Sequence, residues 1–112
     1  MIVTFTLKRG DSWTPRPFEW RQGSVSGDPV NLTGCQVRMQ IRDRTGALVL
    51  DATDYLKVDG PAGAVAVSVP ASETAFFPVE KLPFDIELTF PDGTVQSTKT
   101  MVLHVIRDET LP

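Results

Sequence analysis

The stretch LTGCQVRMQIRD, residues 32–43, decides the fold of this 112-residue chain. Over residues 36–42, apolar and polar side chains alternate without interruption, with Val37, Met39 and Ile41 on one side. This period of two is that of a β-strand with one buried face and one solvated face. The stretch FDIELTF, residues 84–90, repeats the pattern. We therefore expect two half-buried strands whose apolar faces contribute to one shared core.

Weaker alternation, separated by turn residues, predicts the rest of the chain. Further strands are expected over residues 2–9, 17–22, 48–50, 55–58, 64–69 and 94–107, the last with a bulge near residues 97–99. Residues 71–77 lose the period of two, so we expect at most one short helical turn there, with Phe76 or Phe77 closing an end of the core. The predicted fold is an all-β, Ig-like β-sandwich of seven to eight antiparallel strands in a single domain, residues 1–112, with a small barrel as the alternative.

The polar sides of the two strongest strands carry opposite charges. Arg38 and Arg42 lie on one strand, and Asp85 and Glu87 lie on the other. If the strands are neighbours, these charges face each other on the solvated side and help to set the register. Strand pairing between residues 36–42 and 84–90 is therefore a prediction that coordinates can test.

Composition excludes several classes of protein. The chain has 11 Lys and Arg against 14 Asp and Glu, so it lacks the basic surface typical of nucleic-acid binding. No segment approaches the roughly 20 apolar residues of a membrane span. Cys35 is the only cysteine, so an internal disulfide is impossible and folding in a reducing cytosol is expected. We expect no nucleic acid and no membrane among the partners.

No residue pattern predicts catalysis, a cofactor or a metal. One histidine and one cysteine cannot build the usual zinc sites, and no glycine-rich phosphate loop or nucleophile motif occurs. His104 lies within an apolar strand and is interpreted as a half-buried structural histidine. Cys35 is interpreted as a small buried apolar residue. The chain is therefore predicted not to be an enzyme.

The aromatic residues are the candidates for partner contact. Trp13 precedes a Pro15–Pro17 corner, and we expect it to be an exposed anchor for a partner. Tyr55, at the start of an expected edge strand, is a second possible partner contact. Phe18 and Trp20 are expected to pack in the core or at a strand edge.

The order of segments resembles a phage family, the immunoglobulin-like N-terminal domain of baseplate upper proteins and related proteins of the tail-fibre region. The similarity covers nearly the whole chain and depends on combined segments rather than on one motif. The matching segments are residues 9–11 (RGD), 27–30 (GDPV), 31–43 (NLTGCQVRMQIRD), 46–51 (GALVLD), 63–69, 72–75 (SETA), 84–88 (FDIEL) and 91–95 (PDGTV).

This resemblance implies a non-enzymatic structural or adaptor protein of a phage or prophage tail or baseplate. Its location would be the virion tail, after synthesis in the bacterial host cytoplasm, and its partners would be other tail or fibre proteins, with a homo-oligomer left open. The resemblance supplies no catalytic residues. The alternative is a carbohydrate-binding module that uses Trp13 or Tyr55 as an exposed aromatic platform.

Overall fold

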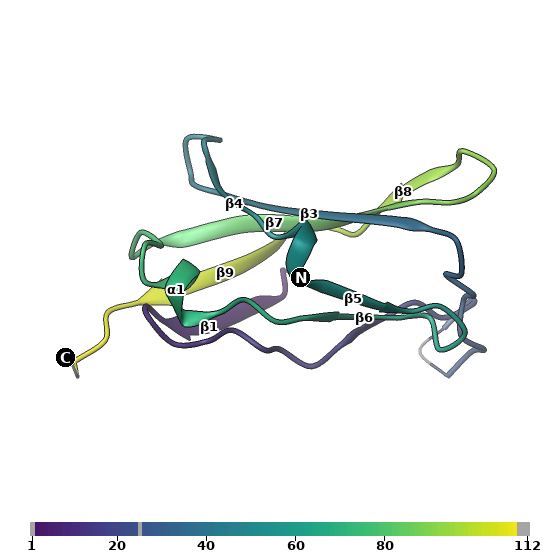
Figure 1. Cartoon of the computed structure of the whole chain (residues 1–112), viewed down its shortest axis with the longest axis horizontal. Helices are drawn as coiled ribbons and strands as arrows, with labels where there is room; N and C mark the ends of the chain where they lie inside the picture. Colours follow the sequence, from purple (N-terminus) through teal and green to yellow (C-terminus); the bar gives the residue numbers. More distant parts are fainter. Residues whose placement is uncertain (1, 25, 110–112) are drawn as a thin grey trace.

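Two β-sheets packed face to face form the molecule (Figure 1). The structure is a computed structural model, and it describes residues 2–24 and 26–109. Its elements are β1 (Thr4–Lys8), β2 (Phe18–Glu19), β3 (Gln36–Arg42), β4 (Leu48–Asp51), the 3₁₀ turn η1 (Thr53–Tyr55), β5 (Leu56–Asp59), β6 (Ala64–Val67), the single-turn helix α1 (Ala71–Thr74), β7 (Lys81–Thr89), β8 (Val95–Ser97) and β9 (Met101–Ile106). The predicted all-β, Ig-like sandwich is confirmed, and the described residues form nine strands where seven to eight were expected.

The larger sheet has the strand order β1-β9-β7-β3-β4, and β8 also pairs with β7. The smaller sheet has the order β2-β6-β5. The expected run over residues 94–107 is divided into β8 and β9, because β7 is long enough to pair with both along one side. β1 is parallel to β9, so the expectation that every strand is antiparallel is wrong at this one pair.

The predicted pairing of the two strongest strands is confirmed. β3 and β7 are antiparallel neighbours, with Arg38 opposite Glu87. Their side chains form an ion pair of 3.8 Å that is largely exposed, which is worth about 0–1 kcal/mol. Arg42 instead donates to the Gln40 side chain at 2.7 Å and to a main-chain carbonyl of the β3–β4 hairpin. One of the anticipated charge pairs therefore forms, and the other arginine supports its own hairpin.

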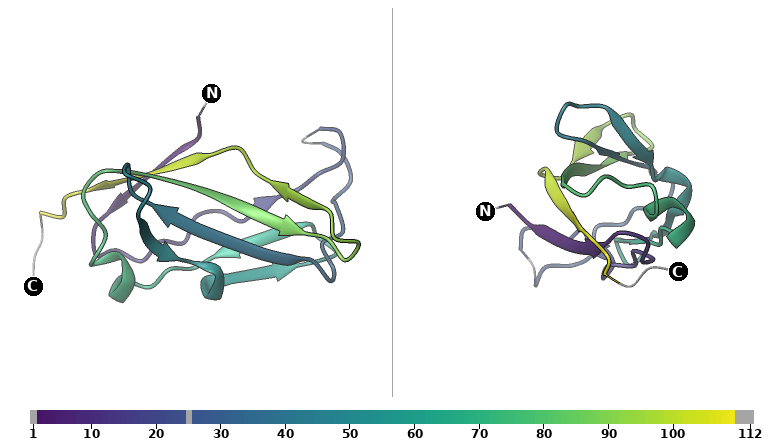
Figure 2. Two further views of the ribbon diagram at one scale, coloured as in Figure 1. Left: turned by 90° about the horizontal axis from the view of Figure 1, so that it is seen from above. Right: turned by 90° about the vertical axis from the view of Figure 1, so that its left-hand side faces the viewer.

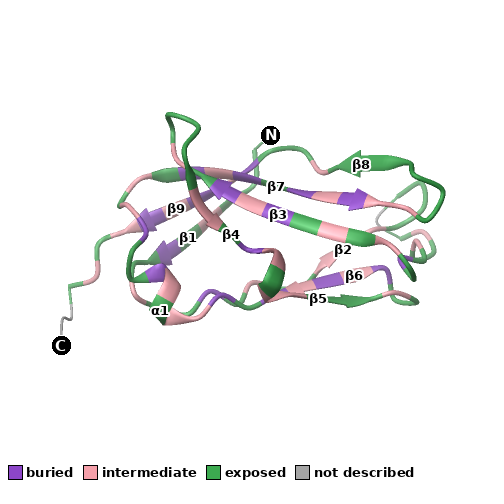
Figure 3. Ribbon diagram, turned by 45° about the horizontal axis from the view of Figure 1, so that its top comes forward, coloured by how far each residue is buried: buried purple, intermediate pink, exposed green. Residues whose placement is uncertain are grey.

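The alternating residues of β3 and β7 point into the core, as the sequence predicts. Met39 and Ile41 on β3 and Ile86 and Leu88 on β7 are buried (Figure 3). An aromatic cluster fills the space towards β1, where the rings of Phe5, Trp13, Phe18 and Phe84 meet mostly edge to face at centroid distances of 5.4 to 6.5 Å. Edge-to-face contact is the arrangement that aromatic quadrupoles favour.

The expected helical turn is α1. It begins after Pro70, and Phe77 just beyond it is buried and closes the core, whereas Phe76 points into solvent. The turn η1 was not expected. It starts where the Asp51 carboxylate accepts a hydrogen bond from the Thr53 N–H at 3.1 Å, and it delays the start of β5 to Leu56.

Candidate functional site

Trp13 is buried in the sandwich, so its expected role as an exposed anchor is wrong. Only 5% of the residue is exposed. Its main chain exchanges hydrogen bonds of 2.9 and 3.0 Å with Val69, which attaches this segment to the smaller sheet. The indole then contacts Phe5 and Phe84 edge to face. The prolines that follow keep the segment irregular, but this single bridge to Val69 directs the side chain inward.

Tyr55 is half-buried at the end of η1. Its ring packs against the main core, and its hydroxyl faces Glu73 of α1. Burial raises the pKa of Tyr55, and the negative charge and hydrogen bond of Glu73 raise it further. The hydroxyl therefore stays neutral beside the Glu73 carboxylate. Partner contact by Tyr55 stays a prediction.

The most exposed large apolar side chain among the described residues is Phe76, which directly follows α1 and is 86% exposed. Its neighbours are held in place. The buried Thr74 hydroxyl donates to the main-chain carbonyl of Asp11 at 2.7 Å, and the next residue, Phe77, is only 2% exposed. Val79, three residues further on, is also exposed. The segment therefore exposes the apolar side chains of Phe76 and Val79 next to residues that are buried and hydrogen-bonded.

The loop that carries Phe76 is also tied to the β3–β4 hairpin. Arg44 of that hairpin forms an ion pair of 3.4 Å with Glu80. We define the α1 surface as four exposed or half-exposed residues: Glu73, Phe76 and Val79 on α1 and the segment after it, and Tyr55 of η1. Sequence reasoning reached Tyr55 but treated Phe76 and Phe77 as interchangeable core candidates.

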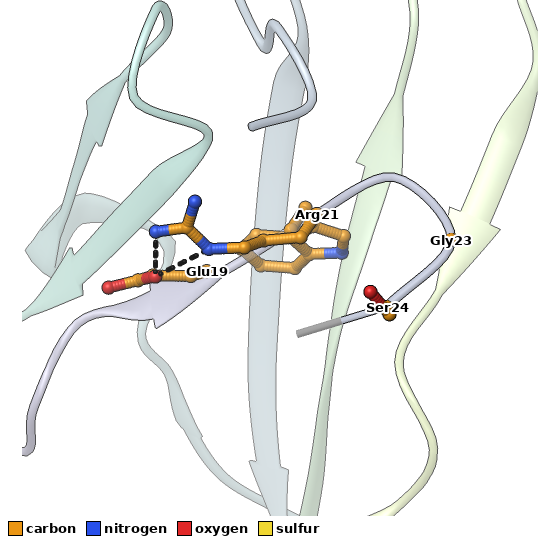
Figure 4. Close-up of a pocket in the computed structure, with 5 residues that line it drawn as sticks. Glu19, Arg21, Gly23 and Ser24 are labelled. Carbon is orange, nitrogen blue, oxygen red and sulfur yellow. Dashed lines mark hydrogen bonds and ion pairs between the residues drawn. The ribbon is translucent and has the colours of Figure 1, made fainter. Parts of the chain in front are cut away.

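An open hollow of about 500 Å³ lies beside β2 (Figure 4). It is lined by Glu19, Trp20, Arg21, Gly23 and Ser24. The Arg21 guanidinium donates to the Glu19 carboxylate at 2.7 and 3.1 Å and to the main-chain carbonyl of Gly27 at 3.3 Å. This arginine therefore braces the wall of the hollow. The arrangement offers no nucleophile beside a base.

His104 and Cys35 have structural surroundings. His104 lies opposite Thr6 and Lys81 in the larger sheet, and half-buried Cys35 packs near Leu32 ahead of β3. No group of three His, Cys, Asp or Glu side chains that could hold a metal ion occurs in residues 2–24 and 26–109. No helix in the described part of the chain is long and apolar enough to cross a bilayer.

Comparison with known proteins supports the fold. No family model matches the sequence, and no curated protein matches it significantly. Among solved structures, CopC from Methylosinus trichosporium OB3b has a TM-score of 0.55 at 16% sequence identity, and the match covers 98% of this chain and 90% of that one. Murine CRIg has a TM-score of 0.45 at 17% identity, and the match covers 93% of this chain and 92% of that one. At this level of identity the likeness shows the sandwich fold alone, and the phage resemblance stays a prediction.

Proposed function

We propose that this chain is a non-enzymatic structural or adaptor domain of a phage or prophage tail or baseplate, which docks onto other tail or fibre proteins through the α1 surface. The order of sequence segments motivates the phage assignment. The observation that carries the docking surface is Phe76, a large apolar side chain exposed at a fixed position.

The energetic value of this residue follows from its exposure. Fully burying a phenylalanine side chain is worth about 1.5–3 kcal/mol, which corresponds to roughly 10- to 150-fold in affinity. The Thr74 hydrogen bond and the buried Phe77 already order the turn, so little conformational entropy is lost on binding. A single contact of this size is weak. Repetition of the domain in a symmetric tail would multiply it.

The described residues contain no arrangement of reactive side chains that is typical of an active site, which supports a non-enzymatic role. His104 and Cys35 pack among structural neighbours, and the hollow beside β2 is braced by an internal ion pair. Residues around Phe76 instead combine an apolar centre with polar neighbours at Tyr55 and Glu73. An aromatic anchor with a polar rim is typical of protein-binding surfaces.

The test is incorporation into tail particles. Particles purified from an induced culture of the bacterium that encodes the chain are analysed by mass spectrometry. Wild-type chain and the Val95→Ser variant are expected in the particles, whereas Phe76→Ser is expected to be lost. Val95 is the matched control because it is an exposed apolar residue on β8, away from α1. Absence of the wild-type chain, or equal retention of Phe76→Ser, would overturn the proposal.

The hollow beside β2 keeps a second candidate function open. Burial of Trp13 removes the main residue of the carbohydrate-binding alternative, but half-buried Trp20 lines an open hollow together with Glu19 and Arg21. Indole faces and paired polar groups can stack on and hydrogen-bond to a sugar ring. A glycan array tests this alternative directly, and lack of retention of the folded wild-type protein at high micromolar concentration would end it.

A further inference from the structure

The outer edge of β1 carries unpaired main-chain groups. β9 is the only strand that pairs with β1 in the described residues. The Val102 N–H donates to the Val3 carbonyl at 3.0 Å, and the Arg9 N–H donates to the Ile106 carbonyl at 2.9 Å. Odd-numbered residues of this segment therefore bond to β9. In this parallel register, the N–H and C=O groups of Thr4 and Thr6 point away from the sheet.

β1 has fewer of the features that protect the other edges, and its single charged residue, Lys8, lies at its C-terminal end. Edge strands are usually kept from pairing by short length, charge or proline. β2 has two residues and follows Pro15 and Pro17, β5 carries Lys57 and Asp59, and β4 and β8 have four and three residues. By contrast, residues 2–7 read IVTFTL, with no charge and no proline. Uncharged segments rich in β-branched and aromatic residues are those that pair most readily with another strand.

The same edge presents both a projection and a hollow. The segment that leads into β1 projects from the rest of the molecule (Figure 2), and Ile2 and Val3 there are exposed, Val3 at 49%. Beside β1 lies an open hollow of about 490 Å³. Its lining combines apolar Phe5, Leu7, Trp13 and Pro15 with polar residues that include Lys8 and Asp11. An exposed apolar side chain and a partly apolar hollow therefore lie a few residues apart along this segment.

We infer that β1 pairs with β1 of a second copy of this chain, antiparallel and about a two-fold axis at Phe5. In this register Thr4 faces Thr6 of the second copy, and four main-chain hydrogen bonds join these residues in the two copies. Val3 faces Leu7 of the second copy, so its side chain enters the hollow beside that strand. The two larger sheets become one continuous sheet.

A second copy fits this edge because each copy carries both the exposed Val3 and a hollow that can accept Val3 of the other copy. In this register, Val3 of each copy contacts the hollow beside Leu7 of the other copy, so the two-fold axis produces the same contact twice. The placement of charges also favours this register, because Lys8 then faces the uncharged Ile2 of the second copy and not another cation. A register shifted towards Lys8 would bring Lys8 and Arg9 of the two copies together, and like charges facing each other destabilise a strand pair.

The inference goes beyond the proposed function, since the residues that would pair, Val3 to Leu7, are not part of the α1 surface. The test is the mass of the purified chain by sedimentation equilibrium over a range of concentrations. We expect a monomer of 12.3 kDa in equilibrium with a dimer. Val3→Lys should weaken the dimer more than ~10-fold, because a charged side chain then replaces the apolar contact with Leu7 of the second copy. Val95→Lys, exposed at 55% on β8, should leave the dimer unchanged.

Two further variants sharpen the result. Thr4→Pro removes an N–H that faces away from β9, so it should abolish the dimer and leave the fold intact by circular dichroism. Phe76→Ser should leave the dimer unchanged, which separates this inference from the proposed docking surface. A monomer at every concentration up to ~1 mM would overturn the inference, since such a dimer would be weaker than that limit. A dimer that resists both Val3→Lys and Thr4→Pro would overturn it as well.

Cross-linking tests the register. In a Cys35→Ser background, Thr4→Cys and Thr6→Cys chains are mixed and oxidised. The facing positions would have Cα atoms about 5.5 Å apart, within disulfide range, whereas Thr4 and its own copy would be out of range. The mixture should therefore cross-link far more than either variant alone. Equal cross-linking of Thr4→Cys by itself would overturn the register centred on Phe5.

Discussion

Gly63, in the turn between β5 and β6, offers the sharpest test of how this turn is held against the main chain at Trp20 and Val30. It is buried and has a φ of +64°, in the left-handed region. The Trp20 N–H donates to the Gly63 carbonyl at 2.8 Å, and the Val30 N–H donates to the Trp20 carbonyl at 2.9 Å. A Cβ at Gly63 would lie 2.5 Å from the Val30 oxygen and 2.8 Å from the Trp20 oxygen. Both are main-chain atoms and cannot move as a flexible side chain would.

The cost of Gly63→Ala has two parts. The left-handed conformation costs an alanine about 1–2 kcal/mol. Relief of the overlap then requires the main chain at Trp20 and Val30 to shift, which weakens two hydrogen bonds worth about 0.5–1.5 kcal/mol each. We therefore expect the free energy of unfolding to fall by about 2–5 kcal/mol. For a domain of this size, that loss lowers the melting temperature by roughly 8–20 °C.

The assay is urea unfolding followed by tryptophan fluorescence, with Gly46→Ala as the matched control. Gly46 has a φ of +90°, but no atom lies within 4 Å of the Cβ position. Gly46→Ala should therefore cost only the conformational part, about 1–2 kcal/mol. If the two variants lose the same stability, the close approach of the 20–30 segment to this turn does not matter energetically, and the reasoning fails.

Three more outcomes follow from the end of the sandwich near α1 and from the β3–β4 hairpin. Phe77→Ala should lower the free energy of unfolding by about 3–5 kcal/mol in urea, whereas Phe76→Ala should change it by less than about 0.5 kcal/mol, and similar losses would contradict the assignment of Phe77 to the core. Thr74→Val should lower the free energy of unfolding by about 1–3 kcal/mol in calorimetry, because the Asp11 carbonyl loses its hydrogen-bond donor. An unchanged free energy of unfolding would show that water replaces this donor. The hydrogen bond from the Thr45 hydroxyl, with main-chain donors in the same hairpin, holds the pKa of Asp43 below its ordinary value of 3.8. A lowered pKa in the folded state contributes stability above the unfolded pKa and loses it as pH falls through the folded pKa. The stability gap between wild type and Asp43→Asn should therefore be present at about pH 6 and close towards about pH 2, and a gap that does not change with pH would exclude this linkage.

The strands that could be predicted are those whose signal is local. The alternation over residues 36–42 and 84–90 is complete within each strand, so it predicts both the elements and their buried faces. The opposite charges at Arg38 and Glu87 favour the two strands as neighbours, since opposite charges at facing positions modestly stabilise a strand pair. The parallel pairing of β1 with β9 could not be predicted, because it joins opposite ends of the chain and leaves no trace in the pattern of either strand.

Side-chain direction outside regular strands is where sequence reasoning failed. The prolines after Trp13 correctly indicate an irregular edge, but whether its indole points in or out depends on one bridge to Val69, 56 residues away in sequence. The adjacent Phe76 and Phe77 have the same local chemistry. A single turn of helix sends one into the core and the other into solvent. Exposure is therefore a tertiary property at these positions, and the candidate binding surfaces could be found only in the structure.

The two proposed surfaces have a joint consequence. A dimer through β1 would leave both α1 surfaces free, because the strand pairing uses none of their residues. Such a dimer would bind two neighbouring sites in a tail, and bivalent binding can exceed the single affinity by 10²–10⁴-fold when the spacing fits. Val3→Lys should then lower retention on tail particles although Phe76 is intact, and mixing in excess wild-type chain should not restore it. If Val3→Lys chains are retained as well as wild type, each α1 surface binds alone, and dimerisation has no part in docking.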